Sequence, residues 1–321
     1  MLYPLKFEPI YKQILWGGKN ISSYFHRDIP LSQVAESWEL CCRDDGTSIV
    51  SNGVLKGTTL QGVILLNREK LLGDKVYQKF GATFPLLIKI IDASENLSVQ
   101  VHPDDAYARD NGEKGGKSEL WYVLDAKENA KLVYGIKKSE SKEDFLKAVS
   151  KNKTEQVLNV VSAKAGDVFY VPAGKVHAIL DGILIAEIQQ NCNTTYRIYD
   201  WGRVDKDGKS RELHTSKALD VIDFQSNNKP ESYSETVNKK DFRTDAILRS
   251  EFFNVDKINV HHRYIGTTKG SFIILMCIQG EGEIMDNSGT IKINLGETIL
   301  LPACLGKFTI YGNMTLLSIF M

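Results

Sequence analysis

Short runs rich in β-branched and aromatic residues dominate the chain, and Gly, Pro and Asn separate them. Seven such runs span residues 84–91, 97–101, 120–124, 168–171, 183–188, 272–278 and 298–301. Many short strands with turn signals between them are typical of a β-sandwich or a β-barrel. The pattern therefore predicts a mainly β protein.

Two segments, about 60–80 and 140–161, instead place apolar residues at helical spacing. Ser139 and Ser141 lie just before Lys142, where the helical pattern of the second segment opens, and are candidate N-caps. We interpret both segments as helical insertions beside a β core. The polar stretch 225–238 contains Pro230 and predicts a connection between two halves, with domain limits of 1–225 and 239–321.

The two halves share one local pattern, a Gly-acidic pair followed by three further positions at offsets of 6, 8 and 11 from the glycine. The members are Gly166-Asp167, Pro172, Gly174 and His177 in the first half, and Gly296-Glu297, Pro302, Cys304 and Lys307 in the second. Each stretch predicts a turn, a short strand and a Pro-containing turn. The repeat indicates two related barrels, of which only the first has a histidine at the last position, so we expect one metal site per chain.

Composition narrows the classes of function. The chain has 321 residues, and its 40 basic and 40 acidic residues balance to a formal net charge of zero. This balance does not favour a partner among nucleic acids or membrane surfaces, whereas a phosphorylated small molecule needs only a local group of cations. The start of the chain does not have the pattern of a secretory signal. The five cysteines form no CxxC pair, which predicts free thiols in a reducing cytoplasm.

One group of side chains has the composition of a metal site. Gln100 and His102 are two residues apart in a predicted strand, so both side chains project from the same face before Pro103 ends the strand. Glu119 begins the next β-rich run, and His177 follows a Pro-Ala-Gly turn. A donor set of imidazole, carboxylate and amide oxygen suits zinc, manganese, iron or cobalt.

The stretch 166–177 resembles the second sequence motif of cupins, whose final histidine binds a metal. Gln100, His102 and Glu119 resemble the variant found in type I mannose-6-phosphate isomerases. Further blocks similar to that family occur throughout the chain, at residues 16–18, 36–39, 84–89, 98–103, 116–121, 186–190, 194–197 and 199–203. The compact length and the Tyr-Asp-Trp-Gly-Arg block are similar to the short bacterial subgroup.

The resemblance implies two cupin-type (jelly-roll) barrels with helical insertions and a metal-dependent aldose–ketose isomerase acting on mannose 6-phosphate and fructose 6-phosphate. It implies one Zn²⁺ per chain, with Gln100, His102, Glu119 and His177 as ligands, although other divalent ions accept the same donors. The implied partner is a small sugar phosphate, and we expect a monomer or a homodimer.

The resemblance also places two cations, Lys117 and Arg197, in the catalytic pocket. Glu187 interrupts an apolar run and is the candidate base, the alternative being a structural ion pair. Lys89 lies in another apolar run, where it requires a carboxylate or a substrate phosphate unless it reaches solvent from an edge strand. Trp16 is expected either to line the pocket or to pack in the core.

Two other functions remain open at this point. One is a cupin of another reaction type, such as an oxygenase or a decarboxylase. The other is a non-catalytic cupin that binds a sugar phosphate. The cations Lys89, Lys117 and Arg197 favour an anionic substrate, and the intact ligand types argue against a vestigial site.

Overall fold

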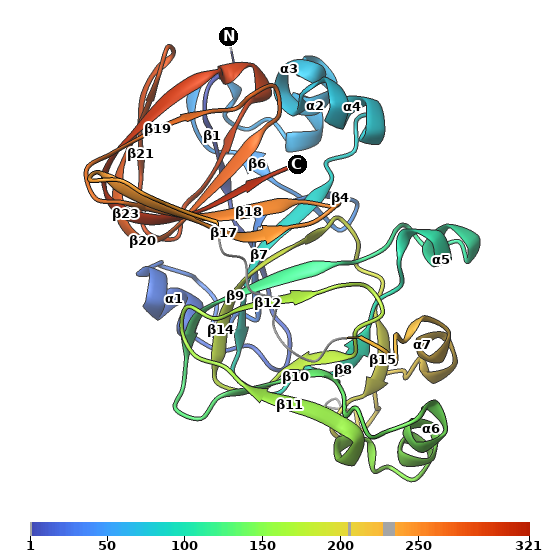
Figure 1. Cartoon of the computed structure of the whole chain (residues 1–321). Coiled ribbons are helices and arrows are strands. Elements are labelled where there is room, and N and C mark those ends of the chain that lie inside the picture. The colour runs from blue at the N-terminus through green and yellow to red at the C-terminus, as the bar shows by residue number, and fades with distance from the viewer. Residues whose placement is uncertain (1, 205–206, 227–234) are drawn as a thin grey trace. The chain divides into compact units, whose positions relative to one another are not determined.

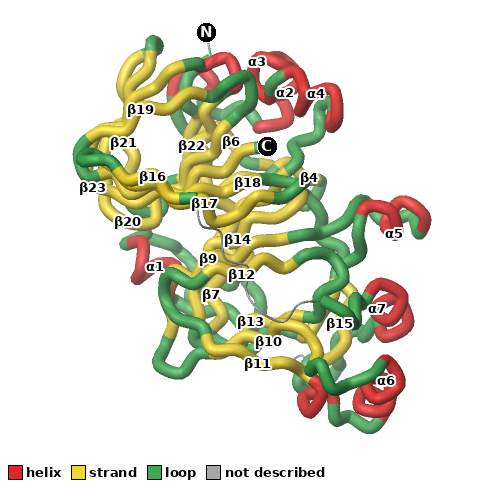
Figure 2. Tube along the Cα trace, in the orientation of Figure 1, coloured by secondary structure: helices red, strands yellow, loops and turns green. Residues whose placement is uncertain are grey.

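The computed structural model describes residues 2–204, 207–226 and 235–321. These residues form a mainly β protein, as predicted (Figure 2). They divide into two compact units. The two-sheet unit comprises residues 11–37 and the described part of 89–226, and the large-sheet unit comprises residues 2–10, 38–88 and 235–321. Three strands run across the limits of these units, namely β2 (Ile10–Lys12), β3 (Glu36–Leu40) and β7 (Leu86–Ala93).

The two-sheet unit is a β-sandwich with helices on one outer face. Its own strands are β8 (Val99–Val101), β9 (Glu119–Ala126), β10 (Lys131–Ile136), β11 (Leu158–Ser162), β12 (Val168–Val171), β13 (His177–Ile179), β14 (Ile183–Gln190) and β15 (Tyr196–Tyr199). Its helices are α1 (Asn20–Phe25), α5 (Asp105–Asp110), α6 (Lys142–Ser150), η2 (Thr154–Val157) and α7 (Thr215–Val221).

The strands are arranged as two antiparallel sheets, in the orders β12-β9-β14-β7-β3-β2 and β11-β10-β13-β8-β15 (Figure 1). The space between them is filled by an apolar cluster with members from both sheets, such as Trp121, Phe169 and Ile179. Val99 and Val101 point to the opposite face, where they join a second cluster with Phe145 of α6 and Ala218 of α7. Alternation along each strand thus separates an inner face from a helix-covered outer face.

The large-sheet unit has ten strands in one sheet: β1 (Leu5–Glu8), β6 (Ile49–Val50), β16 (Thr236–Asn238), β17 (Phe242–Arg249), β18 (Asn254–Val260), β19 (Arg263–Thr267), β20 (Ile273–Asp286), β21 (Gly289–Ile293), β22 (Thr298–Leu301) and β23 (Lys307–Phe320). It also holds β4 (Cys42–Arg43), β5 (Gly46–Thr47), η1 (Gly53–Leu55), α2 (Leu60–Asn67), α3 (Glu69–Leu72), α4 (Asp74–Phe80) and η3 (Ala303–Leu305). Its strands enclose an apolar cluster that includes Leu275, Ile299 and Leu316.

Most predicted elements occur where the pattern places them, with two corrections. Helices α2 to α4 occupy the first predicted helical segment, but the second ends at Val157, because Leu158–Ser162 pairs with β10 as strand β11. Of the predicted connection 225–238, residues 227–234 lie outside the described residues, while Thr236–Asn238 is strand β16 rather than a connection. The predicted domain limits of 1–225 and 239–321 stay a prediction.

The repeated pattern corresponds to the same turn and following strand in both units, a turn–strand motif. Gly166 donates its N–H to Val123 O at 2.8 Å, and Gly296 donates to Cys277 O at 2.8 Å. The acidic residue that follows accepts a backbone N–H three residues earlier in each case. Both glycines have positive φ, 89° and 82°, a conformation that costs little only for glycine. The strands after them, β12 and β22, start at the same offset.

Candidate metal centre

Strand register brings the predicted ligands of the five-stranded sheet to one face. His177 of β13 lies directly opposite Gln100 of β8, and Gln100 lies opposite Arg197 of β15. Directly paired residues of antiparallel strands project from the same side of a sheet. Because Val99 and Val101 face the outer cluster, this row faces the space between the sheets.

The other sheet presents a second row of polar side chains. Glu119 of β9 pairs with Gln189 of β14, and Trp121 pairs with Glu187. Trp121 belongs to the apolar cluster between the sheets, so the other three side chains share that inner face. Glu119, Glu187 and Gln189 are each at most 3% exposed.

Loop hydrogen bonds hold the remaining groups beside these rows. His102 follows β8, and its carbonyl accepts the N–H of Gly174 at 2.9 Å, which ties the turn before His177 to His102. Gly174 has φ 85°, so the turn favours glycine. Pro103 accepts the backbone N–H of Lys117 at 3.0 Å, which places Lys117 next to His102.

The centre consists of His102, Glu119 and His177, whose candidate ligand atoms all lie within 4.8 Å of one another. His102 Nε2 is 3.6 Å from Glu119 Oε2, and His177 Nε2 is 3.3 Å from Glu119 Oε1. The amide of Gln100 reaches the same point, because its Nε2 is 3.4 Å from His177 Nε2. Rotation of this amide by 180° would present its oxygen instead of its nitrogen.

Backbone carbonyls orient both imidazoles. His102 Nδ1 is 2.8 Å from Thr194 O, and His177 Nδ1 is 2.8 Å from Lys175 O. Each Nδ1 must donate to its carbonyl, so each Nε2 carries a lone pair toward Glu119, which is the tautomer that binds a metal. Burial holds the pKa of His102 well below its usual value and lowers the pKa of His177 to about 3. Both rings are therefore neutral at physiological pH, and each can offer its Nε2 lone pair to a metal.

Glu119 completes the donor set. Burial, and then the charge of Glu187, raise the pKa of Glu119 to about 7, although Lys117 opposes the shift. Lys117 Nζ lies 2.8 Å from Glu119 Oε2 and 3.2 Å from His102 Nε2. Two imidazole nitrogens and the two carboxylate oxygens of Glu119 converge here, and such a set fits a divalent cation.

Lys89 and Glu187 form a second charged pair on the inner face. Lys89 Nζ is 2.9 Å from Glu187 Oε1 and 3.5 Å from Glu36 Oε2. Burial would lower the pKa of Lys89, but the two carboxylates outweigh it and raise that pKa. Lys89 is 6% exposed on an inner strand of its sheet, so it does not reach solvent from an edge; its partners are carboxylates.

Glu187 combines the two predicted interpretations, because it is ion-paired and lies on the face that carries Glu119. Trp121 Nε1 donates to Glu187 Oε2 at 2.9 Å. Burial would raise the pKa of Glu187, but Lys89 and Lys117 lower it. Burial alone predicts a raised proton affinity at this carboxyl, and the two nearby lysines reverse that direction. Glu187 is therefore an ionised carboxylate at neutral pH.

Arg197 and Trp16 have different surroundings. Arg197 is half-buried, donating from Nε to Ser98 Oγ at 3.3 Å and from Nη1 to Glu212 O at 2.9 Å. Trp16 is 4% exposed and belongs to the apolar cluster between the sheets, which matches the packing interpretation. The adjacent His261 and His262 are exposed in the turn after β18.

Three residues of this region were not predicted as site residues. Glu36 is the second carboxylate at Lys89, Trp121 holds Glu187, and Gln189 lies opposite Glu119. Two of them carry a readable signal, because Trp121 and Gln189 each stand two residues from a predicted site residue in a strand and therefore share its face. Glu36 is distant in sequence, so its contact with Lys89 depends on the sheet order.

A mainly β sandwich with a buried His–Glu cluster on its inner face defines a metal-binding protein of the cupin type. The model of the type I phosphomannose isomerase catalytic domain matches residues 4–117, and the model of the mannose-6-phosphate isomerase cupin domain matches residues 243–321. A relative from Bacillus subtilis (strain 168), the mannose-6-phosphate isomerase ManA, is 38% identical over 312 residues, which is 96% of each chain. The chain therefore belongs to the type I phosphomannose isomerase family.

Further relatives agree with this assignment. The mannose-6-phosphate isomerase of Streptococcus mutans is 33% identical over 319 residues, covering 99% of this chain and 98% of the relative. The crystal structure of the mannose 6-phosphate isomerase from Bacillus subtilis superposes with a TM-score of 0.91 at 33% identity, and 99% of each chain is covered. The family predicted from the sequence motifs is confirmed. The roles of single site residues stay predictions.

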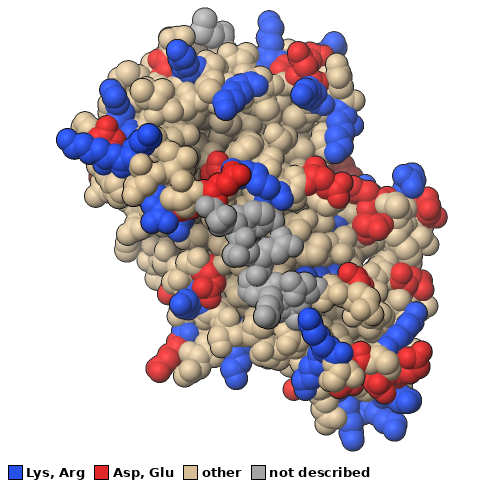
Figure 3. Space-filling view, in the orientation of Figure 1, with Lys and Arg blue, Asp and Glu red and all other residues tan. Residues whose placement is uncertain are grey.

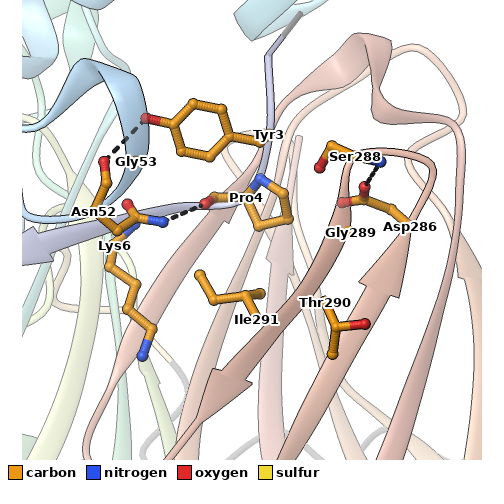
Figure 4. Close-up of a pocket in the computed structure, with 10 residues that line it drawn as sticks. All are labelled: Tyr3, Pro4, Lys6, Asn52, Gly53, Asp286, Ser288, Gly289, Thr290 and Ile291. Atoms are coloured by element: carbon orange, nitrogen blue, oxygen red, sulfur yellow. Dashed lines mark hydrogen bonds between the residues drawn. The ribbon is translucent and has the colours of Figure 1, made fainter.

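A hollow in the large-sheet unit has a different character (Figure 4). It has a volume of about 330 Å³ and lies between β1, the turn at Asn52 and the β20–β21 hairpin. Tyr3 donates to Asn52 O, and Lys6 forms an ion pair with Glu297. It contains no histidine or cysteine among its lining residues, so it does not offer the donor set of the two-sheet unit.

Proposed function

We propose that this chain interconverts mannose 6-phosphate and fructose 6-phosphate by moving a proton between C1 and C2 through an enediolate. One observation carries the proposal. The inner face of β9 and β14 carries two buried acceptors, Glu119 Oε1 and Gln189 Oε1, that have no hydrogen-bond partner among the described residues. The neighbouring Glu119 Oε2 and Glu187 Oε1 are ion-paired with Lys117 and Lys89 at 2.8 and 2.9 Å. A face of unsatisfied acceptors favours a ligand that brings a cation and hydroxyl groups. The relatives from Bacillus subtilis and Streptococcus mutans are named mannose-6-phosphate isomerases, which supports the same reaction.

The metal in this proposal is one Zn²⁺ per chain, held by Gln100, His102, Glu119 and His177. The neutral Nε2 atoms and the carboxylate support it, although cobalt and manganese accept the same donors. When bound, such an ion polarises substrate oxygens and stabilises negative charge that develops on them. The protein contributes a fixed, buried donor set whose imidazole tautomers are already correct.

Buried cations select an anionic substrate over the neutral substrates of other cupin reactions. Lys89 and Lys117 are at most 6% exposed, and Arg197 stands beside Gln100 in the inner row. In a water-poor site such charges act strongly on a phosphate or on a developing oxyanion. An oxygenase or decarboxylase acting on a neutral molecule has no use for three cations around one metal site.

Glu187 is the proposed base. An ionised carboxylate can take the proton from C2 of the aldose and return it to C1, and the lowered pKa keeps Glu187 ionised. Trp121 fixes Oε2, while Lys89 lies at Oε1 and would balance the change in charge as the proton moves. Lys117 and Arg197 would stabilise the enediolate oxygens, and Lys89 would line the substrate site.

The test is a coupled assay for fructose 6-phosphate formed from mannose 6-phosphate, with and without a chelator. We expect turnover that disappears after chelation and returns when zinc is added. Undiminished turnover of the metal-free protein would contradict the metal requirement. No turnover in protein that carries one metal per chain would contradict the isomerase reaction itself.

Helix length, surface charge and cysteine state bear on the cellular location of the enzyme. None of the helices described is long and apolar enough to cross a membrane. On the face seen in Figure 3, basic and acidic side chains are interspersed, in keeping with the formal net charge of zero. All five cysteines are free thiols, which supports a cytoplasmic location for the proposed enzyme. A monomer or homodimer stays a prediction.

A further inference from the structure

Gln189 is a buried amide whose two ends have unequal partners. Its side chain is 0% exposed. Nε2 donates to Gln190 O at 2.8 Å and to Cys192 O at 2.6 Å, which uses both of its hydrogens. Oε1 is buried and has no hydrogen-bond partner among the described residues. The two carbonyls fix the orientation of the amide, because a rotated amide would place its oxygen against both of them.

Gln189 belongs to the row of residues on the inner face of the site. Gln189 lies opposite Glu119 in the β9–β14 pair, and Glu187 lies two residues earlier on the same face. Glu119 and Glu187 are acceptors when ionised, so neither can donate to Gln189 Oε1 in that state. Leaving a buried acceptor unsatisfied costs free energy, and a donor supplied by a ligand would remove that cost.

We propose that Gln189 Oε1 accepts a hydrogen bond from a hydroxyl of the bound sugar and that Gln189 is a specificity-determining residue of the site. The inference rests on the proposed function, since the donor is a neutral hydroxyl at C3 or C4 of mannose 6-phosphate. Carboxylates at this position would add charge next to Glu119. An amide oxygen accepts a hydrogen bond from a hydroxyl without changing the charge of the site.

The experiment is a coupling measurement between substrate and side chain. We would compare kcat/KM for mannose 6-phosphate and for its 3-deoxy and 4-deoxy analogues, in the wild type and in Gln189→Met. The wild type should lose about ten- to a hundred-fold on one of the analogues, because a site built around a hydroxyl is left with an unpaired acceptor. Gln189→Met should lose at most about twofold on that same analogue.

Controls separate this role from a structural one. Gln156→Met, an identical substitution at an exposed glutamine, should keep the full discrimination. Metal content of Gln189→Met should stay at the wild-type ratio, whereas a drop would mean that Gln189 supports Glu119 and would overturn the proposal. If the methionine variant does not fold, the wild-type series alone decides: less than twofold loss on both analogues contradicts the proposal. Normal wild-type turnover in that case leaves the isomerase function standing.

Discussion

The stretch from Gly166 to His177 and the stretch from Gly296 to Lys307 share a backbone and differ in what they enclose. Each begins with a glycine of positive φ, an acidic residue that closes the turn, and a strand at the same offset. Val171 pairs with Glu119, and its counterpart Leu301 pairs with Ile273. The first stretch ends in buried His177 and the second in exposed Lys307.

The interiors differ accordingly. In the two-sheet unit the inner face carries Lys89, Glu119 and Glu187, all buried. In the large-sheet unit the corresponding interior is a cluster of apolar side chains, with Leu275 and Cys277 on β20. The comparison teaches that the turn–strand motif is determined by turn chemistry and hydrogen bonds, whereas the chemistry depends on a few inward positions.

The sharpest way to test the comparison is to change matched positions. Glu119→Ala should lower kcat/KM by roughly a thousand-fold or more, because several kcal/mol of charge stabilisation disappear with the metal. Ile273→Ala should keep metal and activity and cost about 2 kcal/mol of stability. Metal analysis, steady-state kinetics and thermal unfolding measure these effects. An active Glu119→Ala variant would refute the assignment of the centre.

A second prediction concerns the charged pair on the inner face. Lys89→Met should reduce kcat/KM about a hundred-fold. It should also move the acid limb of the pH profile to higher pH, since loss of Lys89 removes a charge that lowers the pKa of Glu187. Lys127→Met, the control, breaks the exposed pair with Asp181. It should change kcat/KM by at most about twofold and leave the acid limb in place. An unmoved acid limb would exclude Glu187 as the base.

The third prediction is a pH dependence of metal binding. Below about pH 7 the metal-free protein holds a proton on Glu119, whose pKa is raised, and the metal must displace it. Apparent affinity should therefore fall about tenfold per pH unit between pH 7 and pH 5. His177, with a pKa of about 3, adds no slope in this range. Competition with a metallochromic chelator measures the slope, and a slope of two protons would contradict the neutral, buried histidines.

The smallest effect is expected from a histidine introduced at the end of the second turn–strand motif. Lys307→His restores the residue type at that offset but leaves Ile273 in place of a carboxylate, beside the apolar cluster. The metal-to-protein ratio and the activity should not change. A second bound metal would mean that this turn–strand motif alone is sufficient to form a metal site.

The turn signals and alternating strands of the sequence were sufficient to predict most of the β elements and the shared direction of Gln100 and His102. They failed at residues 158–162, where apolar residues compatible with a helix pair with β10 instead. They also could not find the contact between Lys89 and Glu36, because this depends on the sheet order. The direction of the pKa shift at Glu187 required its neighbours in space, since burial and Lys89 act in opposite directions.

The most direct test of the central claim is anomalous X-ray scattering at the zinc edge, from crystals grown with one equivalent of zinc per chain. The account predicts one peak per chain, surrounded by His102, Glu119 and His177 with the Gln100 amide beside it. A peak elsewhere, or none at that position, would contradict the claim that only the unit with the first turn–strand motif carries the metal.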